Sequence, residues 1–336
     1  MSAGYDLTFG WDAPYPEVTG YFIPTLLDAA RAFQAPSLRT TAFEAGAWLA
    51  ETRLVSGAIV RKQWRPSNTT PSAFNTGQVV DGWCALAAQS DDPEWAELAR
   101  AAGDWLVEQQ EPDGRWIRSA YNGIAHSYYT RVAWPLARVS ALTGDPRYAA
   151  AARRHLDWVL TQQSADGWIE SAGFDATESP TTHTIAYVLE GLLGAGELLG
   201  DDRYIAAAER GARALRAIYG TQARGLPGRF ARGWQSRAGW RCLTGDAQTA
   251  LVWQRLAIRL GDGAYRAAAE RMIDDLRVTV RVQPSWPEVS GAVQGSSPAW
   301  GGYDPYRYPA HAVKYTLDLL LAVGVGPCQI GDGTVM

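Results

Sequence analysis

The sequence predicts an all-α protein whose repeated helical hairpins close into an (α/α)6 toroid, with a few short strands in the loops. An apolar run at helical spacing begins at each of four threonines, separated by 54, 54 and 60 residues: Thr76, Thr130, Thr184 and Thr244. A second run, rich in alanine and arginine, follows each of them after a turn that in three cases begins with Gly-Asp. Since one such hairpin cannot bury its own apolar face, neighbouring hairpins are expected to stack into a single domain over residues 1–336.

The remaining elements complete the ring in chain order. Residues 1–20 are rich in glycine, proline and aromatic side chains, and we expect an irregular arm there. A short strand is expected over 57–60. The expected inner and outer helices pair as 21–33 with 41–55, 76–88 with 93–110, 130–142 with 146–163, 184–199 with 203–219, and 244–260 with 264–280. A final run over 309–323 supplies a sixth inner helix. This count favours a closed ring over an open solenoid, which would need a polar cap at each end.

Composition argues against several functions. The net charge of −4 gives no basic surface for nucleic acid, and no apolar run reaches the roughly 18 residues of a membrane span. Cys84, Cys242 and Cys328 lack the spacing of metal ligands, so we expect neither a metal nor another cofactor. The N-terminus lacks a secretory signal, which predicts a cytoplasmic protein. Trp and Tyr each occur 15 times against 7 Phe, and this excess of rings with a polar group indicates a partly wet cavity.

Two linkers that follow outer helices share a pattern. Residues 109–116 read Gln-Gln-Glu-Pro-Asp-Gly-Arg-Trp, and residues 162–168 read Gln-Gln-Ser-Ala-Asp-Gly-Trp. In each linker a Gln ends the helix, Asp-Gly makes the turn and a Trp folds back, which predicts a staple between neighbouring hairpins. These linkers resemble the QW repeat of squalene cyclases and protein prenyltransferases, and similar turns occur in carbohydrate-active toroids. The resemblance implies the fold and says little about the chemistry.

Polar side chains gather at one position of the repeat. When the inner helices of a toroid stand side by side, the residues at their starts lie on one rim, around the mouth of the central cavity. Read in register, this rim is expected to hold the following residues: Asn75, Gln78, His126, Tyr128, Tyr129, Arg131, His183, Asp246 and Gln248. The helix N-termini would point their positive ends into the same space, which favours an anionic ligand. Glu190 lies deeper in its helix and is expected to pair with an arginine.

Loops that precede the inner helices add candidates for substrate binding. The segment 291–309 is aromatic and rich in glycine, and its flat rings suit stacking on sugars. Together with the segments 56–72 and 173–180 and the start of the last helix, it provides these candidates: Trp64, Asp175, Trp300, Tyr303, Tyr306 and His311. The loop 282–308 is expected to lie over the cavity mouth. His155, beside two arginines in an outer helix, is expected on the surface.

A group of Tyr, His, Asn and Arg can abstract a proton next to a carboxylate, because preorganised donors stabilise the enolate that forms. The rim resembles the site of toroidal uronate polysaccharide lyases and is similar to the helical domain of glucuronyl C5-epimerases. The resemblance implies that Asn75 and Arg131 hold the carboxylate. Proton transfer then falls to Tyr129 and to His126 or His183. The resemblance implies a metal-independent enzyme of lyase or epimerase type that acts on a glycan or glycoside containing uronic acid. We expect titration of a histidine to limit its activity near neutral pH.

Uronyl hydrolases share the toroid, and this chain resembles them over residues 130–137 and 144–148. Where those hydrolases keep an acidic residue before the helix, this chain has His and Tyr side chains. This difference argues against hydrolysis by paired carboxylates, although Asp175 and Asp246 could still supply such a pair.

Two other classes of function stay open. A terpenoid cyclase or prenyltransferase-like enzyme would share the QW-like turns, but a cyclase needs an acidic Asp-x-Asp-Asp cluster and none stands at the rim. The acidic pair within 273–276 falls in an outer helix, where it is expected on the surface, and the cysteines are badly placed as zinc ligands. A non-catalytic glycan-binding toroid would keep the aromatic side chains without needing His126 and His183.

Overall fold

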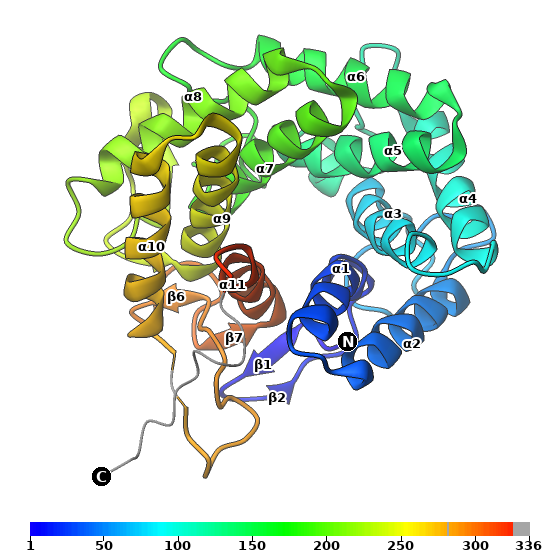
Figure 1. The fold of residues 1–336 in the computed structure, drawn as a ribbon. Helices are drawn as coiled ribbons and strands as arrows, with labels where there is room; N and C mark the ends of the chain where they lie inside the picture. Colours follow the sequence, from blue (N-terminus) through cyan, green and yellow to red (C-terminus); the bar gives the residue numbers. More distant parts are fainter. Residues whose placement is uncertain (281, 325–336) are drawn as a thin grey trace.

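The computed structural model describes residues 1–280 and 282–324, so that Cys328 lies outside the described residues. Its helices form an inner ring and an outer layer (Figure 1). The inner ring consists of α1 (Pro16–Ala32), α3 (Ala73–Ala87), α5 (Thr130–Thr143), α7 (Thr182–Leu199), α9 (Leu243–Leu260) and α11 (Ala310–Ala322). The outer layer consists of α2 (Pro36–Thr52), α4 (Glu94–Gln109), α6 (Pro146–Thr161), α8 (Asp202–Tyr219) and α10 (Gly263–Arg277). Each inner helix packs on the next and α11 packs on α1, which closes the ring and confirms the predicted (α/α)6 toroid.

The turns inside the hairpins follow from their Gly-Asp sequences. Gly144 ends α5 in the left-handed conformation, with φ of 72°, which only glycine adopts at little cost. Asp145 then caps α6, because its side chain accepts a hydrogen bond of 2.9 Å from the Arg147 N–H. The α7–α8 and α9–α10 turns repeat the same two devices.

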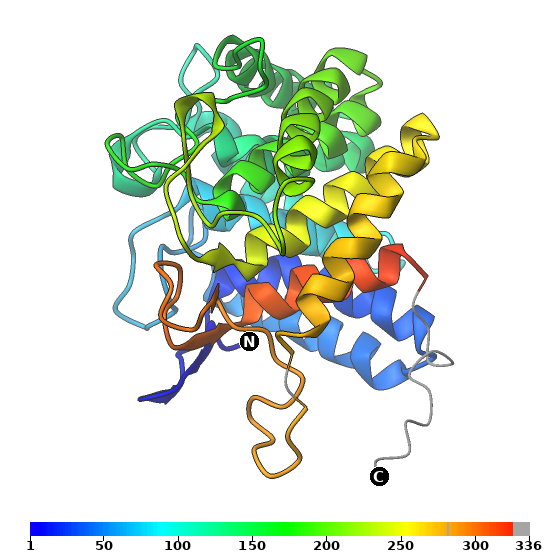
Figure 2. The same ribbon diagram turned by 90° about the vertical axis from the view of Figure 1, so that its left-hand side faces the viewer.

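The long connections of the chain gather at one end of the ring (Figure 2), because the inner helices begin there. The connections into α3, α5, α7 and α9 span 53–72, 110–129, 162–181 and 220–242, and the described part of the connection into α11 covers 278–280 and 282–309. Ser72 and Thr181 cap α3 and α7 with their hydroxyl groups, as expected of polar residues at helix starts. This loop-rich end is the end at which the sequence predicts the polar rim.

Short strands in these connections correct two expectations. Residues 1–20 are not an irregular arm, because α1 begins at Pro16 and β1 (Gly4–Asp6) pairs with β2 (Gly10–Trp11) and β7 (Arg307–Pro309). The strand expected over 57–60 is reduced to one bridge between Val60 and Pro71. Two further pairs join β3 (Phe230–Ala231) to β4 (Gln235–Ser236) and β5 (Arg241–Cys242) to β6 (Ser296–Ser297), and short 3-10 turns cover Tyr121–Gly123, Ser127–Tyr129 and Arg232–Trp234. Through β7, the N-terminal hairpin is fixed beside the start of α11.

The two QW-like linkers staple neighbouring outer helices together, as predicted. The Gln110 amide donates to the Gly114 carbonyl within its turn (3.0 Å) and to a carbonyl of α6 (2.9 Å). Arg154 of α6 in turn donates to the Gln110 side-chain oxygen at 2.7 Å. Gln163 makes the corresponding bonds within its own turn and to α8. The expectation that His155 is a surface residue is wrong, because the stapled turn covers the ring and the Gly114 carbonyl lies 3.0 Å from its Nδ1.

Glycine allows the starts of α7 and α9 to approach closely. A methyl group on Gly245 of α9 would lie 2.6 Å from the backbone nitrogen of His183, an atom that cannot turn aside. Gly245→Ala is therefore expected to lower the free energy of unfolding by about 2 kcal/mol, as in other overpacked cores. The matched control is Gly263→Ala in α10, where no atom lies within 4 Å of the added methyl group. Thermal denaturation of both variants checks the difference, and equal midpoints would contradict the close approach.

Candidate active site

A cavity of about 250 Å³ opens among the starts of the inner helices, at the loop-rich end of the ring. We call it the N-terminal cavity. Aromatic rings make much of its wall: Tyr15, Phe74, Tyr121, Tyr128, Phe174, Tyr187 and Tyr303. The polar residues of the wall are Glu17, Arg61, Lys62, Ser72, Asn75, His183 and His311. An aromatic wall with a few convergent polar groups is typical of small-molecule sites.

Glu17, in the first turn of α1, supplies the carboxyl group of the N-terminal cavity. It is partly exposed to the cavity and accepts a hydrogen bond of 2.5 Å from the Tyr15 hydroxyl. Burial raises the pKa of Glu17, although the bond from Tyr15 and the charges of His311 and Arg131 act in the opposite direction. Such a carboxyl group keeps its proton to a higher pH than a surface carboxyl group does, and it can serve as a proton donor.

His183, in the first turn of α7, ends a chain of hydrogen bonds that crosses three inner helices. The Gln248 amide of α9 donates to the Glu190 carboxylate at 3.4 Å, so that its oxygen faces Nδ1 of His183. Because this oxygen can only accept, Nδ1 carries the proton and Nε2 keeps its lone pair. Arg131 of α5 donates to the other Glu190 oxygen at 3.3 Å and holds the far end of the chain. The chain therefore fixes the tautomer of a ring that lines the cavity.

The surroundings keep the His183 ring neutral. Burial, and then the neighbouring His311, lower the pKa of His183 to about 3. The two imidazole rings stack, with centroids 5.4 Å apart and planes inclined by 14°. Tyr187 and Tyr303 lie against the same ring, with centroid distances of 4.2 and 5.3 Å. Above about pH 3 His183 is thus an uncharged ring in a fixed position, able to act as a base.

His311, at the start of α11, connects the cavity to the aromatic loop. Its Nε2 lies 3.0 Å from the Tyr303 hydroxyl and 3.4 Å from an Asp304 carboxylate oxygen. Burial alone would raise the pKa of Asp304, but the hydrogen bond and charge of His311 lower it overall. The structure therefore brings five of the residues predicted at the rim and in the aromatic loop into one cavity: Asn75, Tyr128, His183, Tyr303 and His311.

Tyr129 and His126 lie behind the cavity wall, and both are fully buried. The Tyr129 hydroxyl accepts a hydrogen bond of 2.9 Å from the Tyr121 N–H, and burial raises its pKa. The two ring nitrogens of His126 face the carbonyl oxygens of Gly173 (3.0 Å) and Tyr121 (2.8 Å), and burial lowers its pKa. The proton-transfer roles predicted for both residues do not fit this placement, since each side chain holds loops together and does not line the cavity.

Asn75, Gln78 and Arg131 are also held by protein partners. Asn75 lines the cavity, but its amide donates to a backbone carbonyl of the preceding loop at 2.8 Å. Gln78 joins α3 to α5 and accepts from the Arg131 guanidinium at 3.2 Å. Arg131 is fully buried, pairs with Glu190 at 3.3 Å as the sequence predicts, and lies 3.8 Å from Asp81. Arg131 is therefore not free to hold a substrate carboxylate, which corrects the role that the resemblance implied.

Asp175 and Asp246 do not form the pair of carboxylates that hydrolysis would need. Asp175 is exposed and accepts from the N–H and the hydroxyl of Thr177, beside a separate cavity of about 510 Å³. Asp246 is fully buried and pairs with Arg241 at 2.8 Å. Burial raises the pKa of Asp246 to about 6 despite this arginine. One carboxylate lies at the surface and the other in the core, so they cannot flank one sugar.

Trp64, Trp300 and Tyr306 lie outside the N-terminal cavity. Trp64 packs edge-on against Trp48 of α2, with ring centroids 6.3 Å apart, and thereby fixes its loop. Trp300 and Tyr306 point to the solvent, with 68% and 53% of their surface exposed. A contact of these two exposed rings with substrate stays a prediction.

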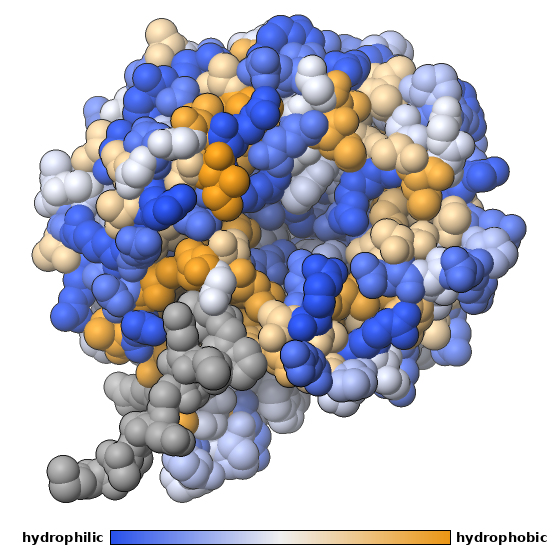
Figure 3. All heavy atoms as spheres, viewed as in Figure 1, coloured by the Kyte–Doolittle hydropathy of each residue, from blue (hydrophilic) through white to orange (hydrophobic). Residues whose placement is uncertain are grey.

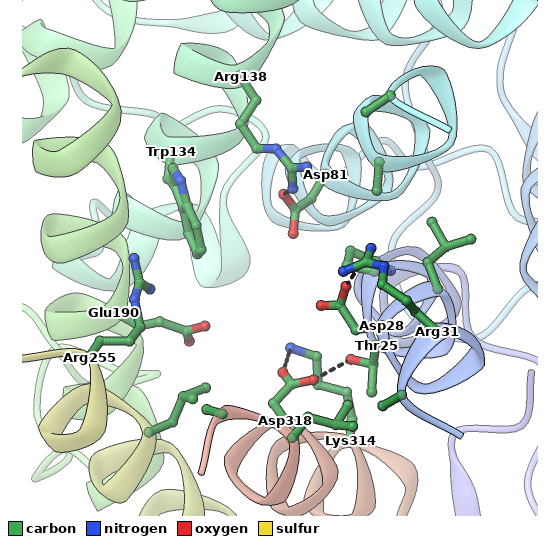
Figure 4. Close-up of a pocket in the computed structure, with 18 of the residues that line it drawn as sticks. Thr25, Asp28, Arg31, Asp81, Trp134, Arg138, Glu190, Arg255, Lys314 and Asp318 are labelled. Carbon is green, nitrogen blue, oxygen red and sulfur yellow. Dashed lines mark hydrogen bonds and ion pairs between the residues drawn. The ribbon is translucent and has the colours of Figure 1, made fainter. Parts of the chain in front are cut away.

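A larger cavity of about 680 Å³ lies where the inner helices end (Figure 4), and the surface is hollowed at the centre of that face (Figure 3). We call it the C-terminal cavity. Charged side chains line it: Asp28, Arg31, Asp81, Arg131, Arg138, Glu190, Arg255, Lys314 and Asp318. These charges pair with one another, as Lys314 does with Asp318 at 2.5 Å and Arg138 with Asp81. Since Nε2 of His183 and the Glu17 carboxyl group remain available, the N-terminal cavity is the better candidate for a reactive centre.

Within residues 1–280 and 282–324, no group of three or more His, Cys, Asp or Glu side chains is arranged to hold a metal ion. In the same described residues, no helix combines the length and the apolar character needed to cross a bilayer.

Sequence reasoning missed Glu17, Tyr15 and Tyr187. A proline at the first helical position followed by an acidic residue is a start signal, and Pro16-Glu17 fits it. Using that signal would have moved the first helix start from Tyr21 to Pro16 and placed Glu17 on the rim. Tyr187 follows His183 by one helical turn, so the same face of α7 could have been extended to it.

Comparison with solved structures finds the same fold in carbohydrate enzymes. No protein-family model matches the chain. An unsaturated glucuronyl hydrolase specific for heparin superposes with a TM-score of 0.76 at 14% identity, over 96% of this chain and 90% of that one. The unsaturated glucuronyl hydrolase of Bacillus sp. GL1 gives 0.74 at 16% identity, over 95% and 89%. The cellobiose 2-epimerase of Bacillus thermoamylovorans B4167 gives 0.73 at 10% identity, over 95% and 91%.

A curated relative belongs to a different class of enzyme. The ent-copalyl diphosphate synthase of Streptomyces sp. (strain KO-3988) is 36% identical over 102 residues, which are 30% of this chain. The chain spans 19% of the length of that relative. At identities of 10 to 16%, likeness to the solved structures establishes the fold alone. The chain thus has the α/α-toroid fold that its sequence resemblances implied, shared with glucuronyl hydrolases and sugar epimerases.

Proposed function

We propose that this protein is a carbohydrate-active enzyme that uses acid–base chemistry on a glycan or glycoside containing a uronic acid. One observation carries the proposal: His183, neutral with Nε2 available, and Glu17, whose pKa is raised, line the same aromatic cavity. The glucuronyl hydrolases and the epimerase that share the fold support carbohydrate as the class of substrate. The oligosaccharide would enter from the loop-rich end of the ring.

The reaction that suits these groups best begins with the proton next to the carboxylate of the uronic acid. Nε2 of His183 takes this proton, and the electron pair of the C–H bond moves toward the carboxylate. In elimination, that pair then forms a C=C bond, the bond to the leaving oxygen breaks, and Glu17 protonates the oxygen. In epimerisation, Glu17 instead delivers a proton to the opposite face of the carbon. In both cases Glu17 loses one proton and His183 gains one, so the charges balance.

The carboxylate of the reacting sugar needs a cation, and Arg61 is placed to supply it. Arg61 lines the N-terminal cavity and donates to the Ala120 carbonyl through Nη2 at 2.7 Å. Its side chain is only partly buried and forms no ion pair in the part of the chain that the structure describes, which leaves guanidinium N–H groups available to an anion. In this proposal Arg61 takes over the role that the sequence resemblance gave to Arg131.

Hydrolysis is less well supported than proton abstraction. A hydrolase of the usual kind needs two carboxyl groups facing the sugar, one as acid and the other as base or nucleophile. Glu17 is one such group, but Asp175 and Asp246 do not line the cavity. The Asp304 carboxylate lies 3.4 Å from Nε2 of His311, so this interaction competes with a contact to the sugar.

Incubation with oligosaccharides of glucuronate and galacturonate tests the proposal. Elimination creates a conjugated C=C bond that absorbs in the ultraviolet. Epimerisation changes the proton NMR spectrum without that absorbance and without shortening the chain, and hydrolysis releases reducing sugar without that absorbance. The proposal expects one of the first two outcomes and its loss in His183→Ala. If micromolar protein leaves both the glucuronate and the galacturonate oligosaccharides unchanged, the proposal is contradicted, and a non-catalytic glycan-binding toroid explains the cavity better.

The curated relative favours a second candidate, a terpenoid cyclase-like enzyme acting on an acyclic prenyl diphosphate. Aromatic walls would also suit an apolar chain, but this sequence contains no Asp-x-Asp-Asp segment. Within 273–276, Asp274 is exposed, as the sequence predicts. Asp275 is buried in α10, which corrects the expectation for this residue, and it accepts a hydrogen bond of 2.7 Å from the Tyr219 hydroxyl. A cyclised product from a prenyl diphosphate would replace the carbohydrate proposal.

The hydrogen-bond chain predicts that Gln248→Glu raises the pKa of His183, because a carboxylate beside Nδ1 stabilises the imidazolium. Protonation removes the base, so the low-pH limb of kcat/KM should move up by about one pH unit or more. In the unaltered protein this limb is expected well below neutrality, not near neutrality as the sequence alone suggested. Gln248→Leu is the control, expected to lower kcat without raising the limb. Superimposable pH profiles for Gln248→Glu and the unaltered protein would contradict the chain.

A further inference from the structure

Three cavities meet around one loop at the loop-rich end of the ring. The N-terminal cavity shares Tyr15, Lys62 and His311 with a cavity of about 310 Å³ in front of β7. It shares Arg61 and Lys62 with a third cavity of about 460 Å³. The residues that line this third cavity are Arg61, Lys62, Gln63, Arg65, Asn68 and Thr70. The buried site thus continues outward over the 61–70 segment, which we call the basic groove.

The cations of the basic groove have no carboxylate partner. No Asp or Glu oxygen lies within 4.0 Å of Arg61, Lys62 or Arg65 in the part of the chain that the structure describes. Arg307, on the neighbouring strand β7, shows the contrast, since it forms an ion pair with Asp12. Lys62 and Arg65 are exposed. In a chain with a net charge of −4, three free cations within five positions form a local anion-attracting surface.

The backbone of the groove is held in place, although it has no regular secondary structure. The Arg61 N–H donates to the Thr70 carbonyl at 2.7 Å, and the Asn68 side chain donates to the Arg61 carbonyl. Lys62 has φ of 63°, in the left-handed region that non-glycine residues rarely adopt. Such strained residues persist where the surrounding structure enforces them, and they cluster at ligand sites. The backbone that carries these cations is therefore held in place, while the Lys62 and Arg65 side chains reach into solvent.

We propose that the basic groove binds the acidic groups of an oligosaccharide chain whose reacting sugar occupies the N-terminal cavity. This rests on the proposed function and narrows its substrate class from a single uronate to a polyanionic chain. Arg61 contacts the reacting sugar, Lys62 lies between the two cavities, and Arg65 contacts the carboxylate or sulfate of the next sugar outward. Guanidinium groups suit this role, because their paired N–H donors match the two oxygens of such an anion.

Calorimetric titration of the Glu17→Gln protein, whose turnover should be slower by roughly 10²-fold or more, tests the groove. The probes are glucuronate, oligogalacturonates of two to four sugars, and neutral cello-oligosaccharides of the same lengths. We expect the affinity for the acidic tetramer to exceed that for the acidic monomer by tenfold or more at low salt, and this ratio to fall as salt is added. The neutral series should show no such rise.

Arg65→Ala in the same background should reduce the tetramer-to-monomer ratio about tenfold, whereas Arg65→Lys should keep part of it. The matched control is Arg266→Ala, which removes an exposed arginine from α10 on the outside of the ring and should leave the ratio unaltered. A ratio near one, or an equal rise for neutral chains, overturns the groove while monomer binding still supports the proposed function. Failure of every acidic probe to bind overturns the proposed function and the groove with it.

Discussion

His183→Ala is expected to lower kcat on a uronate oligosaccharide by about 10³-fold, within the range of 10²- to 10⁴-fold for loss of a general base. The ring lines the N-terminal cavity, and the Gln248 oxygen fixes the proton on Nδ1, so that Nε2 is the basic atom. The substitution leaves a space beside Tyr187, Tyr303 and His311 large enough for free imidazole. Steady-state kinetics with and without added imidazole measures both the loss and its partial recovery.

The interpretation of this loss depends on an intact fold. His183→Ala should lower the thermal midpoint by several degrees, because a cavity replaces the buried ring and the Gln248 oxygen loses its partner. The chain from Arg131 to Gln248 remains, so the variant should still be folded at the assay temperature, which circular dichroism checks. A variant that is folded and keeps kcat within threefold would show that a different group takes the proton.

Glu17→Gln is expected to lower kcat by roughly 10²-fold or more, as for loss of a general acid, and to change the pH profile. Burial raises the pKa of Glu17, so its proton is held to a higher pH than that of an ordinary carboxyl group. An acid works only while protonated, so the activity of the unaltered enzyme should fall as pH rises through this pKa. The amide of the variant cannot titrate, and the high-pH limb should disappear with it.

The matched control for Glu17→Gln is Glu197→Gln. Glu197 lies near the end of α7, at the opposite end of the ring, and pairs with Arg255 at 2.5 Å. The same change of charge there should leave kcat and both pH limbs unaltered. Persistence of the high-pH limb in Glu17→Gln would assign that limb, and the acid role, to another group.

The fold could be predicted from the sequence because the repeat carries two independent signals: the helical spacing of its apolar residues and the Gly-Asp turns between its helices. Gly144 and Asp145 show why, since one ends a helix in the left-handed region and the other caps the next helix. Both devices depend only on neighbouring residues. The structure of residues 1–20 was harder to predict, because β1 pairs with β7, some 300 residues away, as well as with the neighbouring β2.

The site could be predicted only in part. The repeat register placed His183 correctly on the rim, and the aromatic loop pointed to Tyr303. The register could not show that the Tyr129 side chain lies behind the cavity wall. The hydroxyl of Tyr129 is held by the Tyr121 N–H, which belongs to an irregular loop. The register also could not show that Arg131 is unavailable to substrate, since its pairing with Glu190 depends on contact between two inner helices. Register indicates which residues are near one another, whereas the packing decides which atoms remain free.

A crystal structure of the Glu17→Gln protein with bound tetragalacturonate would test the central claim most directly. The account predicts one sugar in the N-terminal cavity, with its carboxylate on Arg61 and the carbon next to it within about 3.5 Å of Nε2 of His183, the distance of a near-attack geometry. Sugar density among the ion pairs of the C-terminal cavity, with the N-terminal cavity empty, would contradict it.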